Sequence, residues 1–445
     1  MKKFIELKLK FLAKLILKKY QPEVVGITGS VGKTSAKEAI YTVLAAKFNN
    51  VRRSLKNYNN EIGVPLTIIG ADSPGRSFFG WLKVFFKAWR LILARDKNYP
   101  RILVLEMAVD RPGDMKYLLS IVKCRVGVVT MIGPVHLEFF GSIEKIKKEK
   151  GRLIKSLRKS GWAILNYDNE KTRQMRALSR ARVLTYGFSK GANIRAQEMN
   201  TSFGQLGQNL DSQIIGVRSN NQPLGINFKI SYNGSVVPVF LPGVLGQAAV
   251  YAALAAVGVG IAYGLNLMEI AKALGKLKFP PGRMNLIPGI KYTLIIDDTY
   301  NASPQSVMAA LDVLREIPVP EGARKYAVLG DMLELGSYSE EGHRTVGRYI
   351  VKAKVDKLIV VGERSRDIAR GAREAGMSED DIFHFPYTKE AGLFLQERIK
   401  AGDLILVKGS QGARMEKIVK EIMADPLHAK DLLVRQGKEW ESKDN

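Results

Sequence analysis

A short glycine-containing stretch near the start of the chain has the residue types that bind a nucleotide phosphate. Residues 24–40 read VVGITGSVGKTSAKEAI. Glycines let backbone amides turn toward phosphate oxygens, a lysine reaches the terminal phosphates, and a threonine hydroxyl is a ligand for Mg²⁺. Gly26 lies one residue before the place where the strict pattern has its first glycine. We expect a nucleotide to bind the loop residues Gly29, Ser30, Gly32, Lys33, Thr34 and Ser35.

A phosphate loop requires a strand before it and a helix after it, and the flanking sequence supplies both. Glu23–Thr28 is a β-branched, apolar run, and Ala36–Phe48 has the periodicity of a helix. Four later apolar runs alternate with helical stretches: Ile102–Glu106, Val126–Thr130, Trp162–Asn166 and Val183–Tyr186. This alternation predicts an α/β domain with a parallel sheet.

The pattern changes in residues 192–242, which are rich in Asn, Gln and Gly and alternate in polarity. We expect a small antiparallel β unit there, with Asn233–Gly234 as a hairpin turn. An alanine-rich helix follows at Ala248–Leu265, and the FPPGR stretch at 279–283 is typical of a linker. Beyond it a second α/β pattern begins, with expected elements at Thr293–Asp297, Pro304–Glu316 (a helix), Tyr326–Leu329, Lys357–Val361 and Leu404–Val407.

We therefore predict an α/β protein in three segments. Residues 1–22 would form a basic amphipathic helix. Residues 23–281 would form a central ATP-binding domain of the P-loop type, with a parallel sheet and the small antiparallel β unit. Residues 282–445 would form a C-terminal Rossmann-like α/β domain of ordinary size.

The charge of the chain points to anionic partners. Among 445 residues there are 69 Lys and Arg against 43 Asp and Glu, a formal net charge of +26. Such an excess favours nucleotides, nucleic acid or an anionic membrane surface. The sequence has no zinc-finger spacing, RNA-binding aromatic motif or basic tail, so we expect no nucleic-acid partner. The single cysteine, Cys124, excludes a disulfide framework and a cysteine-based zinc site, and it indicates a cytoplasmic protein.

Two segments combine basic and apolar residues at helical spacing. Met1–Tyr20 places Lys10, Lys14 and Lys18 in one stripe, and Phe78–Leu93 sets three basic residues opposite six aromatic ones. Charges recur too often for either segment to span a bilayer. One interpretation is that both helices pack into the protein with their lysines in solvent. The other is peripheral contact with the inner face of an anionic membrane.

Several stretches, in order along the chain, resemble the Mur ligase family, the ATP-dependent amide ligases of peptidoglycan synthesis. They are TGSVGKTS, NYNNEIGVPLT, LEMAVDRPGDM, IGPVHLEFFGS, IKKEKGRLI, DDTYNASPQSVMAAL, AVLGDMLELG and LVKGSQGARMEKIV. The resemblance extends from Val24 to Met423, and within the family it is strongest for the branch that adds D-alanyl-D-alanine. It implies a ligase that uses ATP and two Mg²⁺ ions.

The resemblance also implies which residues carry the chemistry. Glu106 matches an acidic Mg²⁺ ligand of the family and would hold the first metal together with Thr34. His136 matches a histidine ligand of a second Mg²⁺, and Lys150 matches the lysine that family members carbamylate. Lys33 would complete the catalytic group. Plainer alternatives are a surface acid for Glu106, a core side chain for His136 and a solvated helix face for Lys150.

Further contacts with nucleotide and substrate follow from the same resemblance. Arg283 would reach the ATP phosphates, Asp298 would hold the ribose, and Asn301 belongs to the same motif. The expected substrate contacts are Asn59, Asn60, Lys408, Ser410 and Arg414. The two asparagines and the aspartate are also ordinary turn residues, which is the alternative for each of them.

The sequence departs from the family pattern in two places. The family has a domain ahead of the ATP loop that helps to hold a UDP-linked substrate, where this sequence has only the basic helix. Near the end of the central domain, Ala248 and Ala249 replace a His-Asn pair that helps to hold the nucleotide, and Ala252 replaces a further asparagine.

Residues and resemblance together predict an ATP-dependent ligase of cell-wall synthesis. It would convert a muropeptide carboxylate into an acyl phosphate, join D-Ala-D-Ala or an amino acid to it, and release ADP and phosphate. One alternative is a Mur-type ligase that acts on a lipid-linked or other non-UDP acceptor. Another is a membrane-attached nucleotide-binding scaffold without turnover, which the intact Lys33, Thr34, Glu106 and His136 disfavour.

Overall fold

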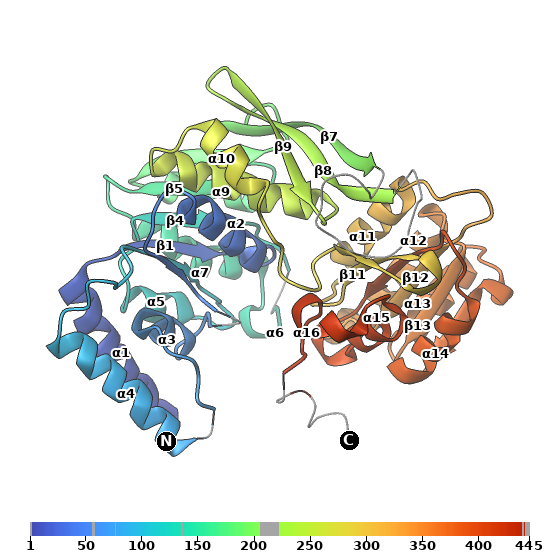
Figure 1. Cartoon of the computed structure of the whole chain (residues 1–445), viewed down its shortest axis with the longest axis horizontal. Coiled ribbons are helices and arrows are strands. Elements are labelled where there is room, and N and C mark those ends of the chain that lie inside the picture. Colours follow the sequence, from blue (N-terminus) through green and yellow to red (C-terminus); the bar gives the residue numbers. More distant parts are fainter. Residues whose placement is uncertain are drawn as a thin grey trace. The chain divides into compact units, whose positions relative to one another are not determined.

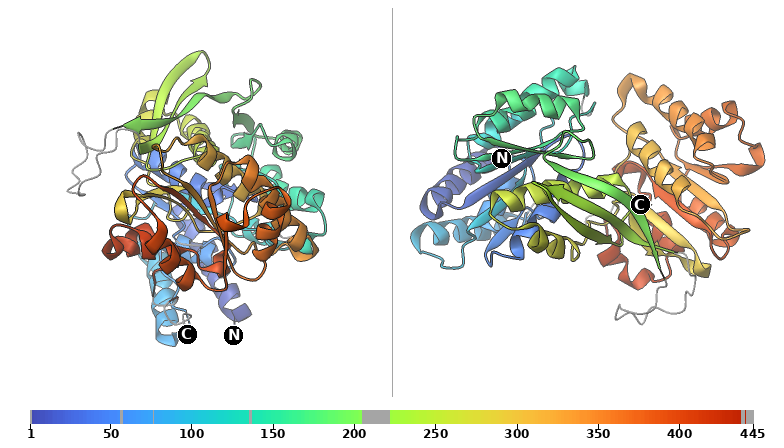
Figure 2. Two further views of the ribbon diagram at one scale, coloured as in Figure 1. Left: turned by 90° about the vertical axis from the view of Figure 1, so that its right-hand side faces the viewer. Right: turned by 90° about the horizontal axis from the view of Figure 1, so that it is seen from above.

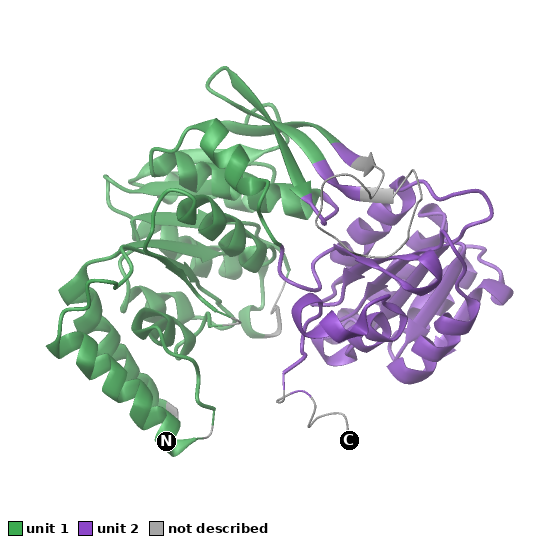
Figure 3. Ribbon diagram, viewed as in Figure 1, with its two compact units in different colours: residues 1–199, 227–241, 247–278 green, residues 200–226, 242–246, 279–445 purple. Residues whose placement is uncertain are grey.

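Two compact units make up the protein (Figures 1 and 3). The computed structural model describes residues 2–55, 58–75, 77–134, 137–204, 222–437 and 440. Unit 1 comprises residues 1–199, 227–241 and 247–278. Unit 2 comprises residues 200–226, 242–246 and 279–445.

Unit 1 is built on a nine-stranded sheet in the order β2-β3-β1-β4-β5-β6-β7-β8-β9, of which residues 200–204, 222–226 and 242 are assigned to unit 2. Its strands are β1 (Glu23–Thr28), β2 (Val51–Arg53), β3 (Ile102–Glu106), β4 (Val126–Val129), β5 (Trp162–Asn166), β6 (Arg182–Gly187), β7 (Ile194–Gly204), β8 (Gln222–Tyr232) and β9 (Ser235–Pro242). Every pairing from β2 to β7 is parallel. The α/β architecture and its parallel sheet are therefore confirmed, and β2 is a strand that sequence reasoning missed.

The expected hairpin lies at one end of this sheet. Asn233 and Gly234 join β8 to β9 with φ angles of 47° and 80°, both in the left-handed region that a two-residue hairpin turn needs. A turn this short joins antiparallel strands. Because β7 pairs with β6, the strands of residues 192–242 continue the main sheet rather than forming a sheet of their own.

Helices cover both faces of the unit 1 sheet (Figures 1 and 2). On one face α2 (Lys33–Ala45) packs against α9 (Gln247–Ala262) and α10 (Leu267–Leu274). The other face carries α3 (Gly63–Ile69), α5 (Asp114–Leu119) and α7 (Ile143–Lys155), and α1 (Lys2–Tyr20) and α4 (Phe78–Leu93) pack with α3. Two shorter helices are α6 (Leu137–Phe140) and α8 (Glu170–Arg173).

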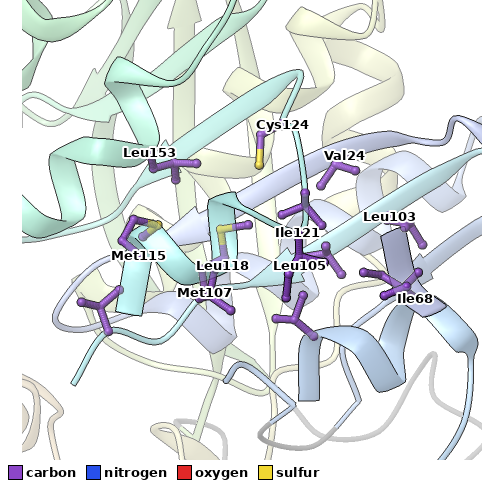
Figure 4. Packing of buried hydrophobic residues seen from close by; sticks show 14 of the residues in the cluster. Val24, Ile68, Leu103, Leu105, Met107, Met115, Leu118, Ile121, Cys124 and Leu153 are labelled. Atoms are coloured by element: carbon purple, nitrogen blue, oxygen red, sulfur yellow. The ribbon is translucent and has the colours of Figure 1, made fainter. Parts of the chain in front are cut away.

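Gly26, which sits too early for a phosphate loop, is a core residue of β1. A Cβ atom at this position would lie 2.7 Å from Cys124 Sγ and 3.2 Å from a methyl group of Leu153, so only glycine fits. Figure 4 shows these two side chains with Val24 and Met107 in the surrounding cluster. Packing beneath the sheet, and not phosphate binding, explains this glycine.

The helices α1 and α4 each present one buried and one exposed apolar row. The buried residues Leu9, Leu12, Ala13 and Ile16 of α1, and Val84, Ala88 and Leu91 of α4, belong to one core cluster. A second row on each helix is exposed. We call this set the outer face: Phe4, Leu7, Phe11, Phe78, Phe79, Leu82, Phe86, Trp89 and Leu93.

Unit 2 is a six-stranded sheet in the order β10-β11-β15-β12-β13-β14, parallel except for the β10–β11 pair. Its strands are β10 (Asn285–Pro288), β11 (Leu294–Asp298), β12 (Lys325–Gly330), β13 (Lys357–Val361), β14 (Ile382–Phe385) and β15 (Leu404–Lys408). Its helices are α11 (Pro304–Glu316), α12 (Ser339–Lys352), α13 (Arg366–Glu374), α14 (Thr388–Arg398), α15 (Glu416–Ile422) and α16 (Ala429–Leu432). The second α/β pattern is confirmed, while the short strands β10 and β14 were not expected.

The two rows of α1 predict opposite effects for the same substitution. Leu12 is 4% exposed and Leu7 is 64% exposed. We expect Leu12→Ala to lower the free energy of unfolding by about 2–4 kcal/mol, because it leaves a cavity in the core. Leu7→Ala should change it by less than about 0.5 kcal/mol. Urea denaturation followed by circular dichroism measures both, and equal losses would contradict the assignment of the two rows.

Candidate active site

The phosphate loop lies between β1 and α2 and rests against the segment that follows β4. Gly29 has a φ angle of 151°, and a Cβ atom there would lie 2.0 Å from Thr130 Oγ1. The Ser30 amide donates to the Met131 carbonyl oxygen over 2.6 Å, and the Thr130 hydroxyl donates to the Val31 carbonyl oxygen over 2.6 Å. The close approach of two backbones, which only glycine allows at this point, fixes the loop.

The start of α2 directs its amides and one lysine at the loop. Gly32, with φ 82°, precedes the helix and has no side chain to cap its first N–H groups, which leaves them for an anion. Lys33 Nζ donates to the carbonyl oxygens of Gly29 and Ser30, at 2.9 and 3.3 Å. The ammonium group is therefore held over the loop, where the terminal phosphates of a nucleotide would bind.

A buried carboxylate faces the loop from the end of β3. Glu106 is 3% exposed, and its Oε1 accepts from the Thr34 hydroxyl over 3.3 Å and from Asn59 Nδ2 over 3.1 Å. Its Oε2 accepts no hydrogen bond from the residues that the structure describes, and Lys37 Nζ lies 3.9 Å away. The alternative of a surface acid is therefore wrong for Glu106.

These residues fit a Mg²⁺ ion. The buried Oε2 of Glu106 accepts no hydrogen bond from the described residues, so it has room for a ligand bond to a cation, and the Thr34 hydroxyl is already in contact with the same carboxylate. Mg²⁺ prefers oxygen ligands and usually binds one or two protein groups together with nucleotide phosphates and water. Thr34 and Glu106 would supply the protein's share.

The two neighbouring asparagines have different surroundings. Asn59 contacts Glu106, as a residue near a metal would. Asn60 Oδ1 instead accepts from the amides of Ile62 and Gly63, at 3.2 and 2.9 Å, at the start of α3. The side-chain oxygen of Asn60 therefore stabilises a turn, as the alternative for this residue predicts.

Lys150 lies on α7 inside the protein. Its side chain is 1% exposed, and Nζ donates to the Val109 carbonyl oxygen over 3.4 Å, so the alternative of a solvated helix face is wrong. Burial, with a smaller contribution from the charge of Lys33, lowers the pKa of Lys150 to about 7. At neutral pH, a large fraction of the protein molecules then carries Lys150 as a neutral amine. His136, the expected second metal ligand, lies outside the described residues.

In unit 2, three expected site residues meet at the carboxyl ends of parallel strands. Asp298 ends β11, Lys408 ends the neighbouring β15, and the two are paired in register. Lys408 Nζ lies 2.5 Å from Asp298 Oδ2 and donates to the Asn301 carbonyl oxygen over 2.9 Å. Burial raises the pKa of Asp298, while the ammonium of Lys408 opposes that shift. This strand edge is the usual ligand position in such sheets.

The remaining expected residues of unit 2 also have protein partners. The Ser410 hydroxyl donates to the Ala302 carbonyl oxygen over 3.3 Å and accepts from the Leu333 amide over 2.8 Å. Arg414 Nε donates to Glu416 over 2.6 Å. The guanidinium of Arg283 lies 3.8 Å from the centre of the Tyr300 ring.

Sequence reasoning missed three residues around these sites. Lys37, one turn after Thr34 on α2, approaches Glu106, and this helical spacing was a usable signal. Asp297 is fully buried, and burial raises its pKa to about 6. Tyr251, close to the replaced residues Ala248 and Ala249 on α9, donates its hydroxyl to Asp168 over 2.9 Å.

Protein-family comparisons match two domains of this chain. The Mur ligase middle domain matches residues 27–78 and 89–260, and the glutamate ligase domain of Mur ligases matches residues 282–411. A UDP-N-acetylmuramoyl-tripeptide–D-alanyl-D-alanine ligase from Bacillus subtilis is 32% identical over 417 residues, covering 94% of this chain and 79% of the relative. The ligase of the same name from Escherichia coli is 29% identical and covers 92% of this chain and 79% of the relative.

Two solved structures that are similar to this chain are also MurF ligases. The MurF ligase from Thermotoga maritima in complex with ADP is 27% identical with a TM-score of 0.73, covering 94% of this chain and 83% of that one. MurF from Acinetobacter baumannii is 25% identical with a TM-score of 0.74, covering 94% and 81%.

The state of Lys150 predicts a reaction with carbon dioxide. Only a neutral amine forms a carbamate, so we expect ¹³C NMR with labelled bicarbonate to show a carbamate signal that grows as pH rises through about 7, at equal dissolved carbon dioxide. Lys150→Gln should remove this signal. Lys148→Gln, at an exposed position of the same helix, should retain it. A signal that is independent of Lys150, or equal at pH 6 and pH 8, would contradict the prediction.

Proposed function

The chain belongs to the Mur ligase family of ATP-dependent ligases, and from this premise we propose that it joins D-alanyl-D-alanine to a muropeptide carboxylate in peptidoglycan synthesis. The names of the relatives that span most of the chain support this choice of substrates. The observation that carries the proposal is the contact between Thr34 of the phosphate loop and the buried Glu106. This contact joins a phosphate-binding loop to a Mg²⁺ ligand.

The reaction would proceed in two transfers. An oxygen of the muropeptide carboxylate attacks the γ-phosphorus of ATP, the bond to ADP breaks, and an acyl phosphate forms. The amine of D-Ala-D-Ala then attacks the acyl carbon, phosphate leaves, and the amine loses a proton. Negative charge builds up on the transferred phosphoryl group and then on the tetrahedral intermediate, so catalysis depends on positioning and on stabilising that charge.

The residues of the loop would bind and orient the phosphates. The amides of Gly32 and the first turn of α2 and the ammonium of Lys33 would face the phosphate oxygens. Thr34 and Glu106 would hold a Mg²⁺ ion, which when bound neutralises phosphate charge. We assign His136 and a carbamylated Lys150 to a second Mg²⁺, and the burial and lowered pKa of Lys150 support that assignment.

Further assignments fall in the expected C-terminal domain, residues 282–445, which we consider by itself. We assign Arg283, Asp298 and Asn301 to the nucleotide. The amino acid or dipeptide would contact Lys408, Ser410 and Arg414. The support for both assignments is that Asp298, Asn301 and Lys408 meet at one strand edge of unit 2.

A lipid-linked muropeptide is the second candidate acceptor, and the outer face of α1 and α4 favours it. An apolar, basic surface suits a substrate that is attached to a membrane. We place the ligase in the cytoplasm, where ATP is available, at the inner face of the membrane. The same two transfers apply to either acceptor.

Phosphate release tests the function directly. With ATP and Mg²⁺, we expect phosphate to form only when both D-Ala-D-Ala and a muropeptide acceptor are present, and mass spectrometry to detect the amide product. Comparing UDP-linked and lipid-linked acceptors in parallel distinguishes the two candidates. Absence of ADP with every muropeptide acceptor would refute both.

Removing the loop lysine should stop turnover without unfolding the protein. We expect Lys33→Ala to lower the rate by about 100-fold or more, because the phosphates lose their positioned cation. Lys47→Ala is the matched control, since Lys47 follows α2 and is paired with Glu269 at the protein surface. It should leave the rate unchanged. A Lys33→Ala protein that retains full activity would exclude this role for Lys33.

A further inference from the structure

On α4 the outer face contains a continuous row of side chains that the described residues leave exposed. Phe79 and Phe86 are 74% and 73% exposed, and the row Phe79, Leu82, Phe86, Trp89 and Leu93 has successive members three or four residues apart. The buried row of the same helix points to the opposite side. The exposed row is therefore a second apolar stripe, in addition to the one that holds α4 in the core.

The position of α4 is fixed, so the exposed row does not result from a loosely attached helix. Lys19 Nζ, at the end of α1, donates to the carbonyl oxygens of Leu91, Ile92 and Ala94 at 3.0, 2.8 and 2.8 Å. These bonds satisfy the last carbonyls of α4 and join the carboxyl ends of the two helices. Tyr20 adds a bond from its hydroxyl to the Leu91 carbonyl oxygen over 3.0 Å.

The same arrangement directs the exposed rows of both helices outward. Because the buried rows of α1 and α4 join one core cluster, their opposite rows face away from it. In Figures 1 and 2 the amino ends of both helices extend past the rest of unit 1. The exposed residues Phe4, Leu7, Phe78 and Phe79 lie at these projecting ends.

Basic residues border the apolar ones. Lys83 and Arg90 are exposed and follow Phe79 and Phe86 by four residues, so each lies beside an exposed ring. The expectation that the basic residues lie opposite all six aromatic residues is therefore wrong, because part of the aromatic set is on the exposed side of α4. The sequence of α1 contains seven lysines and one acidic residue, Glu6, and that of α4 contains three basic residues and no acidic one. The surface is thus apolar and cationic.

We propose that the outer face of α1 and α4 binds the surface of an anionic lipid bilayer. Phenylalanine, leucine and tryptophan side chains would enter the boundary between headgroups and acyl chains, and the bordering lysines and arginine would contact the headgroup phosphates. No helix in the described residues is long and apolar enough to cross a membrane.

The positive charge of the chain favours an anionic lipid surface, rather than a second copy of the chain, as the partner of the outer face. A symmetric contact between two outer faces would bring the basic borders of two chains of net charge +26 together, at an electrostatic cost. An anionic bilayer offers the opposite charge and an apolar interior to the same residues. This inference does not rest on the proposed substrates, because it uses neither the phosphate loop nor the ligase reaction.

Cosedimentation of the full chain with vesicles tests the proposal. We expect the protein to bind phosphatidylcholine vesicles that contain phosphatidylglycerol at least about tenfold more tightly than pure phosphatidylcholine vesicles at low salt, and less tightly as salt is raised. The Phe79→Ser/Phe86→Ser variant should lose about tenfold or more of this affinity. Leu427→Ser, which changes a 90% exposed leucine of unit 2, should bind as the unchanged protein does.

A second double variant tests how much the basic residues contribute to vesicle binding. Lys83→Gln/Arg90→Gln should weaken binding and reduce its dependence on salt. Circular dichroism should be unchanged in both double variants, because all four positions lie on the surface. Failure to bind anionic vesicles, or binding that neither double variant weakens, would overturn the proposal. So would a dimer in sedimentation velocity that Phe79→Ser/Phe86→Ser dissociates, since the outer face would then contact a second copy.

Discussion

The buried carboxylate of Glu106 is the interaction on which the candidate site depends. A carboxylate without compensating partners inside a protein costs several kcal/mol, so the residues around it must supply hydrogen bonds and positive charge. Thr34 and Lys37 come from the start of α2, and Asn59 comes from the segment before α3. Parallel pairing of Ile27 with Glu106 holds β3 beside the strand that leads into the loop. One carboxylate at the end of β3 thereby joins α2 and the segment before α3 in one candidate site.

Local patterns predicted the elements and the phosphate loop, because a strand, a glycine turn and a helix leave their signals within a few neighbouring residues. What they could not supply was contact between distant segments. Gly26 looked like a misplaced loop residue until Cys124, far along the chain, explained it. Lys150 looked like part of a solvated lysine run until its burial was known. The short strands β2, β10 and β14 exist through pairing with their neighbours, which single-sequence periodicity does not show.

The two amphipathic helices α1 and α4 each combine a row of core residues with a row of exposed apolar residues. Packing into the core and exposure of an apolar, basic surface were set against each other as alternatives, yet α1 and α4 do both, with different rows of residues. Side chains are distributed all around a helix, so one helix can have a buried row, an exposed apolar row and basic residues beside the exposed row. Fixing the helices through their buried rows is what gives the exposed rows a defined direction.

Calorimetric titration with a non-hydrolysable ATP analogue, with and without Mg²⁺, tests most directly whether Glu106 and Thr34 form a metal–nucleotide site. In the unchanged protein, Mg²⁺ should tighten binding by about tenfold or more, because Glu106 and Thr34 would hold the ion and the ion would offset the charge of the phosphates. In Glu106→Gln, which retains the shape and the hydrogen-bonding oxygen but loses the charge, Mg²⁺ should add little. An equal enhancement by Mg²⁺ in both proteins would contradict the account.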